Sequence, residues 1–182
     1  MRGPLKDSPS IPKVLPATLV RAPMAVLSDR DIVAAREAGR LRIDPFDPKN
    51  VTPNGYDLTI AEVAVLTTPP KTVTTGSASV PAHARFAVST AEVVELGPDI
   101  AAQLWLRTTW ARQGVIAVFG KVDAGFRGTL TLPAMNANDS PLQLPVGERY
   151  AQIVFETLLN PAEKVYAQRS GQYQDQRGVR LR

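Results

Sequence analysis

The chain has 182 residues, 44% of them hydrophobic, which is enough to bury the core of one domain. Sixteen prolines and 12 glycines interrupt it too often for a helical bundle and predict short strands joined by turns. With no cysteine and one histidine, His83, it excludes a disulfide framework, a cysteine nucleophile and a zinc centre built on cysteine and histidine.

The excess positive charge lies at the two ends of the chain. Residues 1–24 and 165–182 each carry a net charge of +3, so the residues between them carry −2 of a total of +4. The central residues, 25–164, have no excess of basic side chains and so lack the basic surface that is typical of a nucleic-acid-binding protein. We therefore expect no nucleic-acid partner. No stretch reaches the ~20 apolar residues of a membrane span, and residues 1–24 lack the apolar run of a signal peptide. We therefore expect a cytoplasmic protein with no membrane partner.

In chain order, residues 1–24 are predicted to be a flexible basic arm, because prolines interrupt them repeatedly. Ser28, with Asp31 three positions later, is typical of a helix start, and Gly39 ends the pattern, which predicts a helix over residues 28–38. Beyond the turn at Asn54 and Gly55 the chain changes to short runs of β-forming residues. The predicted strands are residues 58–60, 62–66, 85–88, 93–96, 103–106, 115–118, 129–132, 142–144 and 150–158.

This spacing of strands and turns predicts an all-β barrel or sandwich over residues 25–164. Residues 165–182 change character again, because they are rich in glutamine and arginine and contain little that could pack. We predict that they form a mobile C-terminal tail.

Three segments carry candidate functional side chains, namely residues 107–114, 122–128 and 147–154. Arg107 and Arg112 are permanently charged and suited to phosphate oxygens, and the hydroxyl groups of Thr108 and Thr109 are donors at the same turn. Together they form a candidate anion site.

The other two segments contribute a carboxylate, a ring and an amide. Asp123 lies on a glycine-rich turn, where it could orient a water and accept its proton, and the ring of Phe126 could pack against a sugar. Gln152 stands in an apolar strand, where a buried amide needs partners.

Each of these residues also has an ordinary structural interpretation. An aspartate among glycines is often a turn former, and the two arginines could pair with surface acids. Phe126 and Trp110 would by default belong to the core.

Six segments, taken in order, resemble motifs of the dUTPase and dCTP deaminase superfamily, particularly those of archaeal dCTP deaminase-like dUTPases. The segments are residues 28–32, 53–58, 107–114, 122–128, 147–155 and 170–176. They extend over nearly all of residues 25–178. The resemblance implies a distorted, jelly-roll-like β-barrel with a short N-terminal helix, assembled as a homotrimer.

The resemblance also bears on which reaction the chain catalyses. Deaminases of this group place a glutamate ten residues after the motif aspartate, and counting from Asp123 leads here to Pro133. Proline has no ionisable group to move protons at a cytosine ring. The resemblance therefore implies a dUTP diphosphatase, which releases dUMP and pyrophosphate from dUTP.

By this resemblance, Asp123 is the catalytic residue that positions the attacking water. The implied substrate-binding residues are Arg107, Thr108, Thr109, Arg112, Phe126, Gln152, Tyr166 and Gln176, the last two closing over dUTP from the tail. Backbone groups of the hairpin over residues 117–122 would read uracil. Mg²⁺ is the implied cofactor, carried by the substrate phosphates, because the sequence offers no acidic cluster to form a metal site.

Two departures from the family pattern stand out. Thr108 and Thr109 replace the commoner pair of serines, and Gln172 stands where deaminases have a phosphate-binding lysine. Arg169 and Arg177 are the candidates to compensate for that missing charge. The alternatives left open are a dCTP deaminase, an enzyme with both activities, and a nucleotide-binding homologue without turnover.

Overall fold

The computed structural model describes residues 25–181 of the chain. The predicted basic arm, residues 1–24, lies outside the described residues, as does Arg182. The helices described are α1 (Asp29–Glu37), α2 (Thr108–Arg112) and α3 (Tyr166–Arg169), with a 3-10 turn at Pro48–Asn50. The strands described are β1 (Leu41–Asp44), β2 (Val51–Thr52), β3 (Gly55–Val65), β4 (Lys71–Val73), β5 (Ser77–Val80), β6 (Arg85–Thr90), β7 (Val93–Leu96), β8 (Ile100–Leu106), β9 (Val115–Ala117), β10 (Lys121–Val122), β11 (Arg127–Gly128), β12 (Thr131–Asn136), β13 (Leu142–Pro145) and β14 (Arg149–Thr157).

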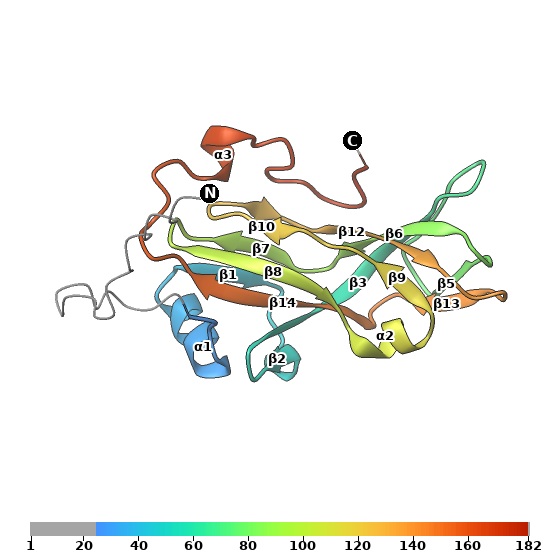
Figure 1. Ribbon diagram of the computed structural model, residues 1–182, viewed down its shortest axis with the longest axis horizontal. Coiled ribbons are helices and arrows are strands. Elements are labelled where there is room, and N and C mark those ends of the chain that lie inside the picture. Colours follow the sequence, from blue (N-terminus) through green and yellow to red (C-terminus); the bar gives the residue numbers. More distant parts are fainter. Residues whose placement is uncertain (1–24, 182) are drawn as a thin grey trace, which may run out of the picture.

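The described strands form one large antiparallel sheet and two small ones. The large sheet has the order β10-β8-β14-β3-β6-β12-β9, with β2 and β4 also paired to β3. The smaller sheets have the orders β1-β7-β11 and β13-β5. In Figure 1 the long strands β3, β8 and β14 run side by side through a curled sheet, and α1 and α3 lie on opposite sides of it. This arrangement confirms the predicted all-β fold with a short N-terminal helix.

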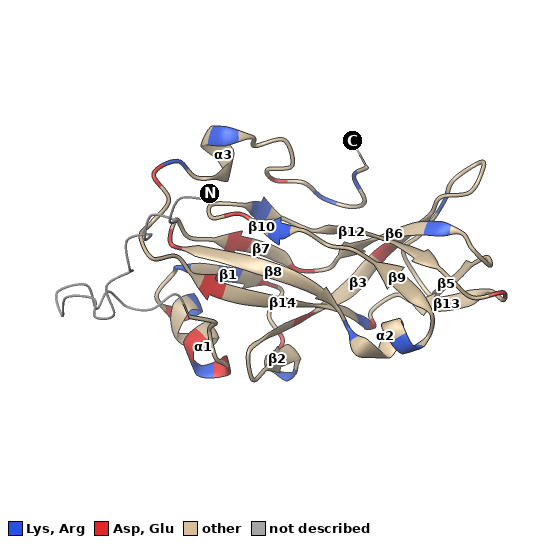
Figure 2. Cartoon of the chain, viewed as in Figure 1, with Lys and Arg blue, Asp and Glu red and all other residues tan. Residues whose placement is uncertain are grey.

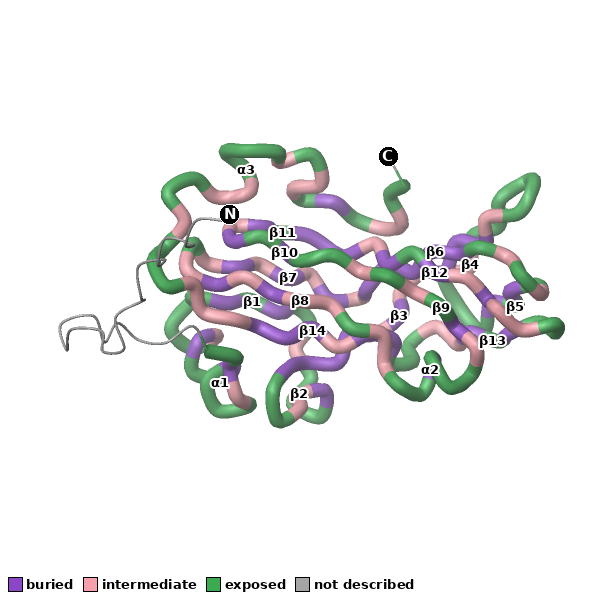
Figure 3. Tube along the Cα trace, in the orientation of Figure 1, coloured by how far each residue is buried: buried purple, intermediate pink, exposed green. Residues whose placement is uncertain are grey.

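The interior of the curled sheet is apolar. β14 lies between β8 and β3, and of its nine residues only Arg149 is exposed, while Tyr150, Ala151 and residues 153–155 are buried. The rings of Phe86, Trp110 and Phe119 surround that of Tyr150 at centroid distances of 6.1–6.4 Å. Figure 3 shows the buried residues concentrated on the strands and the exposed ones on the helices and connections.

The predicted helix agrees with α1. The Ser28 hydroxyl accepts a hydrogen bond from the Asp31 backbone N–H, and the Asp31 carboxylate accepts one from the Ser28 N–H, which forms the expected capping box. Helix α1 buries Ile32 and Ala35 against the core.

Several strand boundaries differ from the prediction for local reasons. Residues 58–60 and 62–65 belong to one strand, β3, because its register against β6 shifts at a bulge between Ile60 and Glu62 instead of breaking. The strand predicted at 129–132 lies later, as β12, because the Thr129 N–H donates to Gln176 in the C-terminal segment instead of a neighbouring strand. The pattern analysis did not identify β1, β2, β4, β5, β10 and β11.

Candidate active site

Four of the predicted binding residues line one cavity of about 450 Å³ at the end of β8, here called the arginine–threonine cavity. The residues that line it are Thr52, Asp57, Trp105, Leu106, Arg107, Thr108, Thr109 and Gln152. They come from β2, β3, β8, β14 and the start of α2. The cavity therefore brings together side chains that lie up to 100 positions apart in the sequence.

Arg107 is held at the point where β8 turns into α2. Its backbone N–H donates to the Tyr150 carbonyl at 3.1 Å, which continues the pairing of β8 with β14 by one residue. Its side chain donates from Nη1 to the Arg149 carbonyl at 3.3 Å, an acceptor shared with Trp110 Nε1 at 2.8 Å. The guanidinium is thus fixed at the cavity wall.

Asp57 is a residue of this cavity that the sequence reasoning missed. Its side chain is 7% exposed, and its Oδ2 lies 3.0 Å from Arg107 Nε and 3.5 Å from Arg149 Nη1. Burial raises the pKa of the Asp57 carboxyl, and the two guanidinium groups act in the opposite direction. Its place in the motif over residues 53–58 was the available signal.

Gln152 has the partner that a half-buried amide requires. It pairs with Asp57 across β14 and β3, and its Nε2 donates to Thr52 Oγ1 at 2.7 Å. Gly55 lies beneath this amide, and a Cβ there would stand 2.6 Å from the Ile153 carbonyl oxygen, so only glycine allows the two strands to approach this closely.

Arg112 does not join the other predicted phosphate-binding residues. It lies exposed at the end of α2, and it is not among the residues that line the arginine–threonine cavity.

The second group of predicted residues meets in a different cavity, of about 370 Å³, here called the aspartate cavity. It is lined by Asp123, Phe126, Tyr166 and Gln176, together with Leu104, Gly120, Lys121, Val122, Leu130, Thr131, Ser170, Gln172 and Tyr173. The Asp123 carboxylate is therefore placed beside the ring of Phe126 and the C-terminal segment.

Residues 166–176 of the C-terminal segment form one wall of the aspartate cavity and contact the residues around it. The Tyr166 ring packs edge-on against Phe126 at 5.6 Å, and the Gln176 Nε2 donates to the Thr129 carbonyl at 2.7 Å. The carboxylate of Asp175 pairs with the Arg127 guanidinium, whose hydrogen bonds hold the pKa of Asp175 below its usual value. The mobility of residues 165–182 stays a prediction.

Gln176 is 6% exposed, and its Oε1 is buried with no hydrogen-bond partner among residues 25–181. The Gln176 amide thus uses its Nε2 donor, while its Oε1 acceptor has no partner in the described part of the chain.

A third cavity, of about 430 Å³, joins the other two along β8. It is lined by Gln103, Leu104, Trp105, Leu106, Ala117, Val118, Phe119, Gly120 and Lys121, and so shares residues with both neighbours. The hairpin over residues 117–122, predicted to read uracil, forms one wall. Within a single chain, then, Arg107 and Asp123 belong to separate cavities linked by this one.

Pro133 lies beside the aspartate cavity. It lines a small cavity with Thr131, Tyr173, Gln176, Arg180 and Leu181, three of which also line the aspartate cavity. Strand β9 pairs with β12 only at residues 134–136, so the edge of β12 that faces β9 is unpaired at Pro133. A proline, which has no backbone N–H to donate, is tolerated at such an unpaired edge. Among the described residues that line these two cavities, Asp123 supplies the one carboxylate.

Arg169 and Arg177, the arginines named from the sequence as candidates to compensate for Gln172, lie outside the aspartate cavity, and their compensating role stays a prediction. Arg177 Nη1 donates to the Gln176 carbonyl at 2.8 Å. Lys121 does line it, with its Nζ 3.2 Å from Glu156 Oε2.

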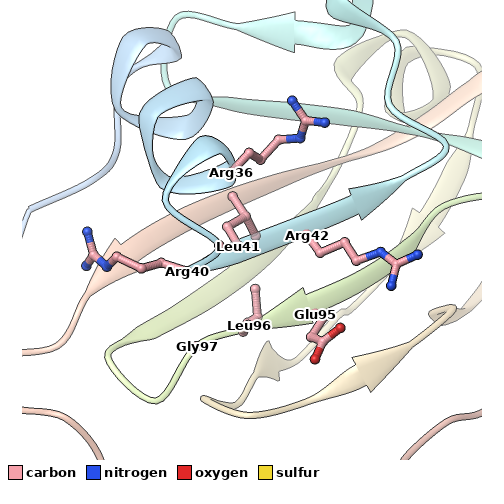
Figure 4. Close-up of a pocket in the computed structure, with 8 residues that line it drawn as sticks. Arg36, Arg40, Leu41, Arg42, Glu95, Leu96 and Gly97 are labelled. Atoms are coloured by element: carbon pink, nitrogen blue, oxygen red, sulfur yellow. The ribbon is translucent and has the colours of Figure 1, made fainter.

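A further cavity, of about 300 Å³, lies between α1 and the pair β1–β7 and contains three arginines (Figure 4). Arg40 pairs with Asp99 and Arg42 with Asp44, and Arg36 lies 3.5 Å above the Phe46 ring. The three guanidinium groups point in different directions in Figure 4, so they do not converge on one ligand.

The remaining charged groups indicate no other site. In Figure 2 basic and acidic residues are mixed over the described chain and do not separate by sign. Residues 25–181 contain no group of three or more histidine, aspartate or glutamate side chains able to hold a metal ion. His83 is exposed and lies 3.1 Å from Asp139 on the surface. None of the helices described has the length and apolar character to cross a membrane.

Comparison with known proteins gives a consistent result. Residues 26–158 match the sequence model of a family described as dCTP deaminase-like. A protein named dCTP deaminase from Thermococcus gammatolerans is 34% identical over 140 residues, which cover 76% of this chain and 87% of the relative. A protein named probable deoxyuridine 5′-triphosphate nucleotidohydrolase from Sulfolobus islandicus rod-shaped virus 1 is 35% identical over 158 residues, which cover 86% and 97%.

A solved structure also resembles the chain. The crystal structure of 2′-deoxycytidine 5′-triphosphate deaminase from Agrobacterium tumefaciens matches it with a TM-score of 0.64 at 19% identity. The match covers 74% of this chain and 48% of that one, so this chain spans about half of the solved protein. The likeness shows a shared fold.

Proposed function

This chain belongs to the dCTP deaminase-like family, and we propose that within it the chain acts as a dUTP diphosphatase, hydrolysing dUTP to dUMP and pyrophosphate. The observation that carries the proposal is Pro133. The family's deaminases place a glutamate at this position, and here the wall beside the aspartate cavity offers no carboxyl group at it. Asp123 remains to act on a water.

In the proposed reaction, Asp123 accepts a proton from a water as the water oxygen attacks the α-phosphorus. The new bond joins that oxygen to phosphorus, and the bond to the oxygen bridging the α- and β-phosphates breaks. Pyrophosphate leaves, and the proton remains on the Asp123 carboxyl. Because the carboxylate is exposed on its turn, it can reach a water in the cavity.

The other residues would bind and orient dUTP. Arg107, Thr108, Thr109 and Gln152 would hold the triphosphate, as the donors of the arginine–threonine cavity allow. Phe126 would pack against the deoxyribose, and Tyr166 and Gln176 would cover the nucleotide. Arg112 lies outside the cavity of its own chain, so we do not assign it to the triphosphate of that cavity.

We propose Mg²⁺ as the cofactor, bound by the substrate phosphates. The donor set fits this mode, because Asp57 is engaged by two arginines and residues 25–181 offer no cluster of acids for a separate metal site. When bound, Mg²⁺ would neutralise charge on the triphosphate.

We also propose a homotrimer in which one chain supplies the arginine–threonine cavity and another the aspartate cavity. The separation of these two groups within one chain supports this arrangement, as does the apolar surface near the cavity that joins them, where Trp105 is 57% and Val118 87% exposed. Mixing inactive Arg107→Ala and Asp123→Asn chains tests it. Shared sites predict recovered activity in mixed trimers, and sites within one chain predict none.

The first experiment is to incubate the protein with Mg²⁺ and either dUTP or dCTP, following pyrophosphate, ammonia and the nucleotide products. The proposal predicts that dUTP yields pyrophosphate and dUMP. It predicts that dCTP yields neither pyrophosphate nor ammonia. The Asp123→Asn variant is the control for contaminating activity.

The second candidate is a dCTP deaminase, alone or with diphosphatase activity. The name of the Thermococcus gammatolerans relative favours it. Ammonia from dCTP would establish this candidate and show that another group replaces the glutamate. No product from either nucleotide would favour a nucleotide-binding protein without turnover.

A further inference from the structure

The small cavity that contains Pro133 also contains a basic side chain, that of Arg180 near the end of the chain. The cavity has a volume of about 250 Å³ and is here called the proline cavity. It shares Thr131, Tyr173 and Gln176 with the aspartate cavity, so the two adjoin. We propose that Arg180 is a specificity-determining residue, whose guanidinium donates to the O4 carbonyl of uracil and disfavours the 4-amino group of cytosine. This inference rests on the proposed function, which places the base beside Pro133.

The backbone around Arg180 is attached to two strands of the large sheet. The Arg180 N–H donates to Thr131 Oγ1 at 3.0 Å, and the Val179 N–H donates to Glu62 Oε1 at 3.3 Å. The Thr131 hydroxyl donates in turn to the Gly178 carbonyl at 3.5 Å. These contacts join residues 178–180 to β12 and β3, and they bring the Arg180 side chain to the proline cavity.

The face of β12 that holds Arg180 is also the face of Pro133. Thr131 and Pro133 lie two positions apart on this strand, so their side chains point to the same side of it. The burial pattern agrees, because Leu132 between them is buried, whereas Thr131 is half-buried and Pro133 is exposed. The side chain at position 133 and the guanidinium of Arg180 therefore border the same small volume.

The chemistry of the proline cavity favours a hydrogen-bond acceptor on the ligand. The Arg180 side chain has no hydrogen-bond or ion-pair partner among residues 25–181, and a guanidinium has donors only. Pro133 supplies no carboxylate that could accept from an amino group. A pyrimidine O4 accepts hydrogen bonds, whereas the N4 amino group of cytosine donates them. Uracil would therefore complement Arg180, and cytosine would oppose its donors with donors of its own.

A free arginine also attracts phosphate groups, so this alternative has to be separated from contact with the base. We assign the triphosphate to the arginine–threonine cavity, and Arg180 does not line that cavity. A contact with phosphate would strengthen the binding of dUTP and dCTP alike. A contact with the base would change the ratio of the two affinities, which is therefore the quantity to measure.

The test uses the full chain and measures affinities for the α,β-imido analogues of dUTP and dCTP, which resist hydrolysis at the α-phosphorus. We expect the wild type to prefer the dUTP analogue, and Arg180→Gln to lower this preference about tenfold. Arg180→Lys retains the charge and should keep the preference within about threefold of wild type. Arg85→Gln is the matched control, because Arg85 is exposed at the start of β6 and lines none of the cavities described above.

A third ligand tests the contact at O4 itself. The analogue with 4-thiouracil keeps the N3–H of uracil and replaces O4 by sulfur, which is a weaker acceptor. The wild type should bind it several-fold more weakly than the uracil analogue, and Arg180→Gln should bind the two equally well. Equal losses in both proteins would overturn the inference. So would a wild type without preference between dUTP and dCTP analogues, or an Arg180→Gln variant that binds both more weakly by the same factor.

The two proposals fail in different ways. If the wild type prefers the dUTP analogue through Arg180 but does not hydrolyse dUTP, the proposed function fails and the inference stands. If it hydrolyses dUTP and the preference is the same in Arg180→Gln, the proposed function stands and the inference fails.

Discussion

The buried carboxyl group of Glu92 makes a specific prediction about how stability depends on pH. Glu92 is 2% exposed, between β6 and β7, and its oxygens accept hydrogen bonds from the Thr59 N–H and the Thr59 hydroxyl, both at 2.9 Å. No cation pairs with it among residues 25–181. Burial raises the pKa of Glu92, and the hydrogen bonds from Thr59 only partly oppose this.

The direction of the pH effect follows from that raised pKa. The unfolded pKa of Glu92 is its value in the unfolded chain, and the folded pKa is its higher value in the folded protein. At pH values between the two, the folded protein binds a proton that the unfolded chain has released. The contribution of Glu92 to the free energy of unfolding is therefore full below the unfolded pKa, decreases as pH rises through this interval, and stays low above it. Each unit of difference between the two pKa values contributes about 1.4 kcal/mol.

Two substitutions separate the charge of Glu92 from its hydrogen bonds. Glu92→Gln keeps the shape and is neutral at every pH, so the decrease attributed to Glu92 should vanish, and the variant should be more stable than wild type at pH 8. Glu92→Ala removes both hydrogen bonds and a methylene group and leaves the Thr59 N–H without its acceptor. It should cost about 2–4 kcal/mol at pH 5.

Urea unfolding followed by tryptophan fluorescence, at one protein concentration from pH 4.5 to 8, measures these differences. Glu37→Gln is the control, because Glu37 is exposed on α1. A Glu92→Gln protein that is less stable than wild type at pH 8, or that shows the same pH dependence, would refute the reasoning.

Three further predictions concern the site and its support. Asp123→Asn should lower kcat for dUTP hydrolysis by at least about 10²-fold and leave the affinity for a dUTP analogue nearly unchanged; equal turnover in the variant would contradict the proposed role. Gly55→Ala should weaken triphosphate binding and lower the unfolding midpoint, because its Cβ would force β3 away from the Ile153 carbonyl; calorimetry and binding at one temperature check both effects. Asp175→Asn, which breaks the pair with Arg127, should speed proteolysis within residues 165–181 several-fold, and unchanged cleavage would show that the pair does not hold this segment.

The parts of the fold that sequence predicted are those set by local patterns. The capping box at Ser28 and Asp31 gave α1, and β7 was predicted with its observed bounds, Val93–Leu96. The strands that were missed have two to four residues, and β10 and β11 have only two. So few side chains cannot show the alternation of apolar and polar residues that predicts a strand. The bulge in β3 divided one strand into two in the prediction, since it shifts the alternation of side chains by one residue.

The candidate site was predictable only where one short segment carries the chemistry. Arg107 with its two threonines, and Asp123 with Phe126, could be named because they are neighbours in the sequence. The contacts that orient them join distant segments: Asp57 pairs with Arg107 across 50 positions, and Thr52 with Gln152 across 100. Periodicity carries no information about such pairs, so Asp57 and Thr52 were missed.

The arrangement of the three cavities gives β8 and β14 a common role. Strand β8 runs past all three, from Leu104 in the aspartate cavity to Leu106 beside Arg107, and β14 pairs with it over that length and also carries Gln152. A shift of this pair by one residue would move Trp105 and Gln152 to the opposite face of the sheet. Such a shift is costly, because it would move the half-buried polar side chains of Gln152 and Glu156 into positions now held by buried apolar ones. The core of this fold therefore sets the register on which the candidate site depends.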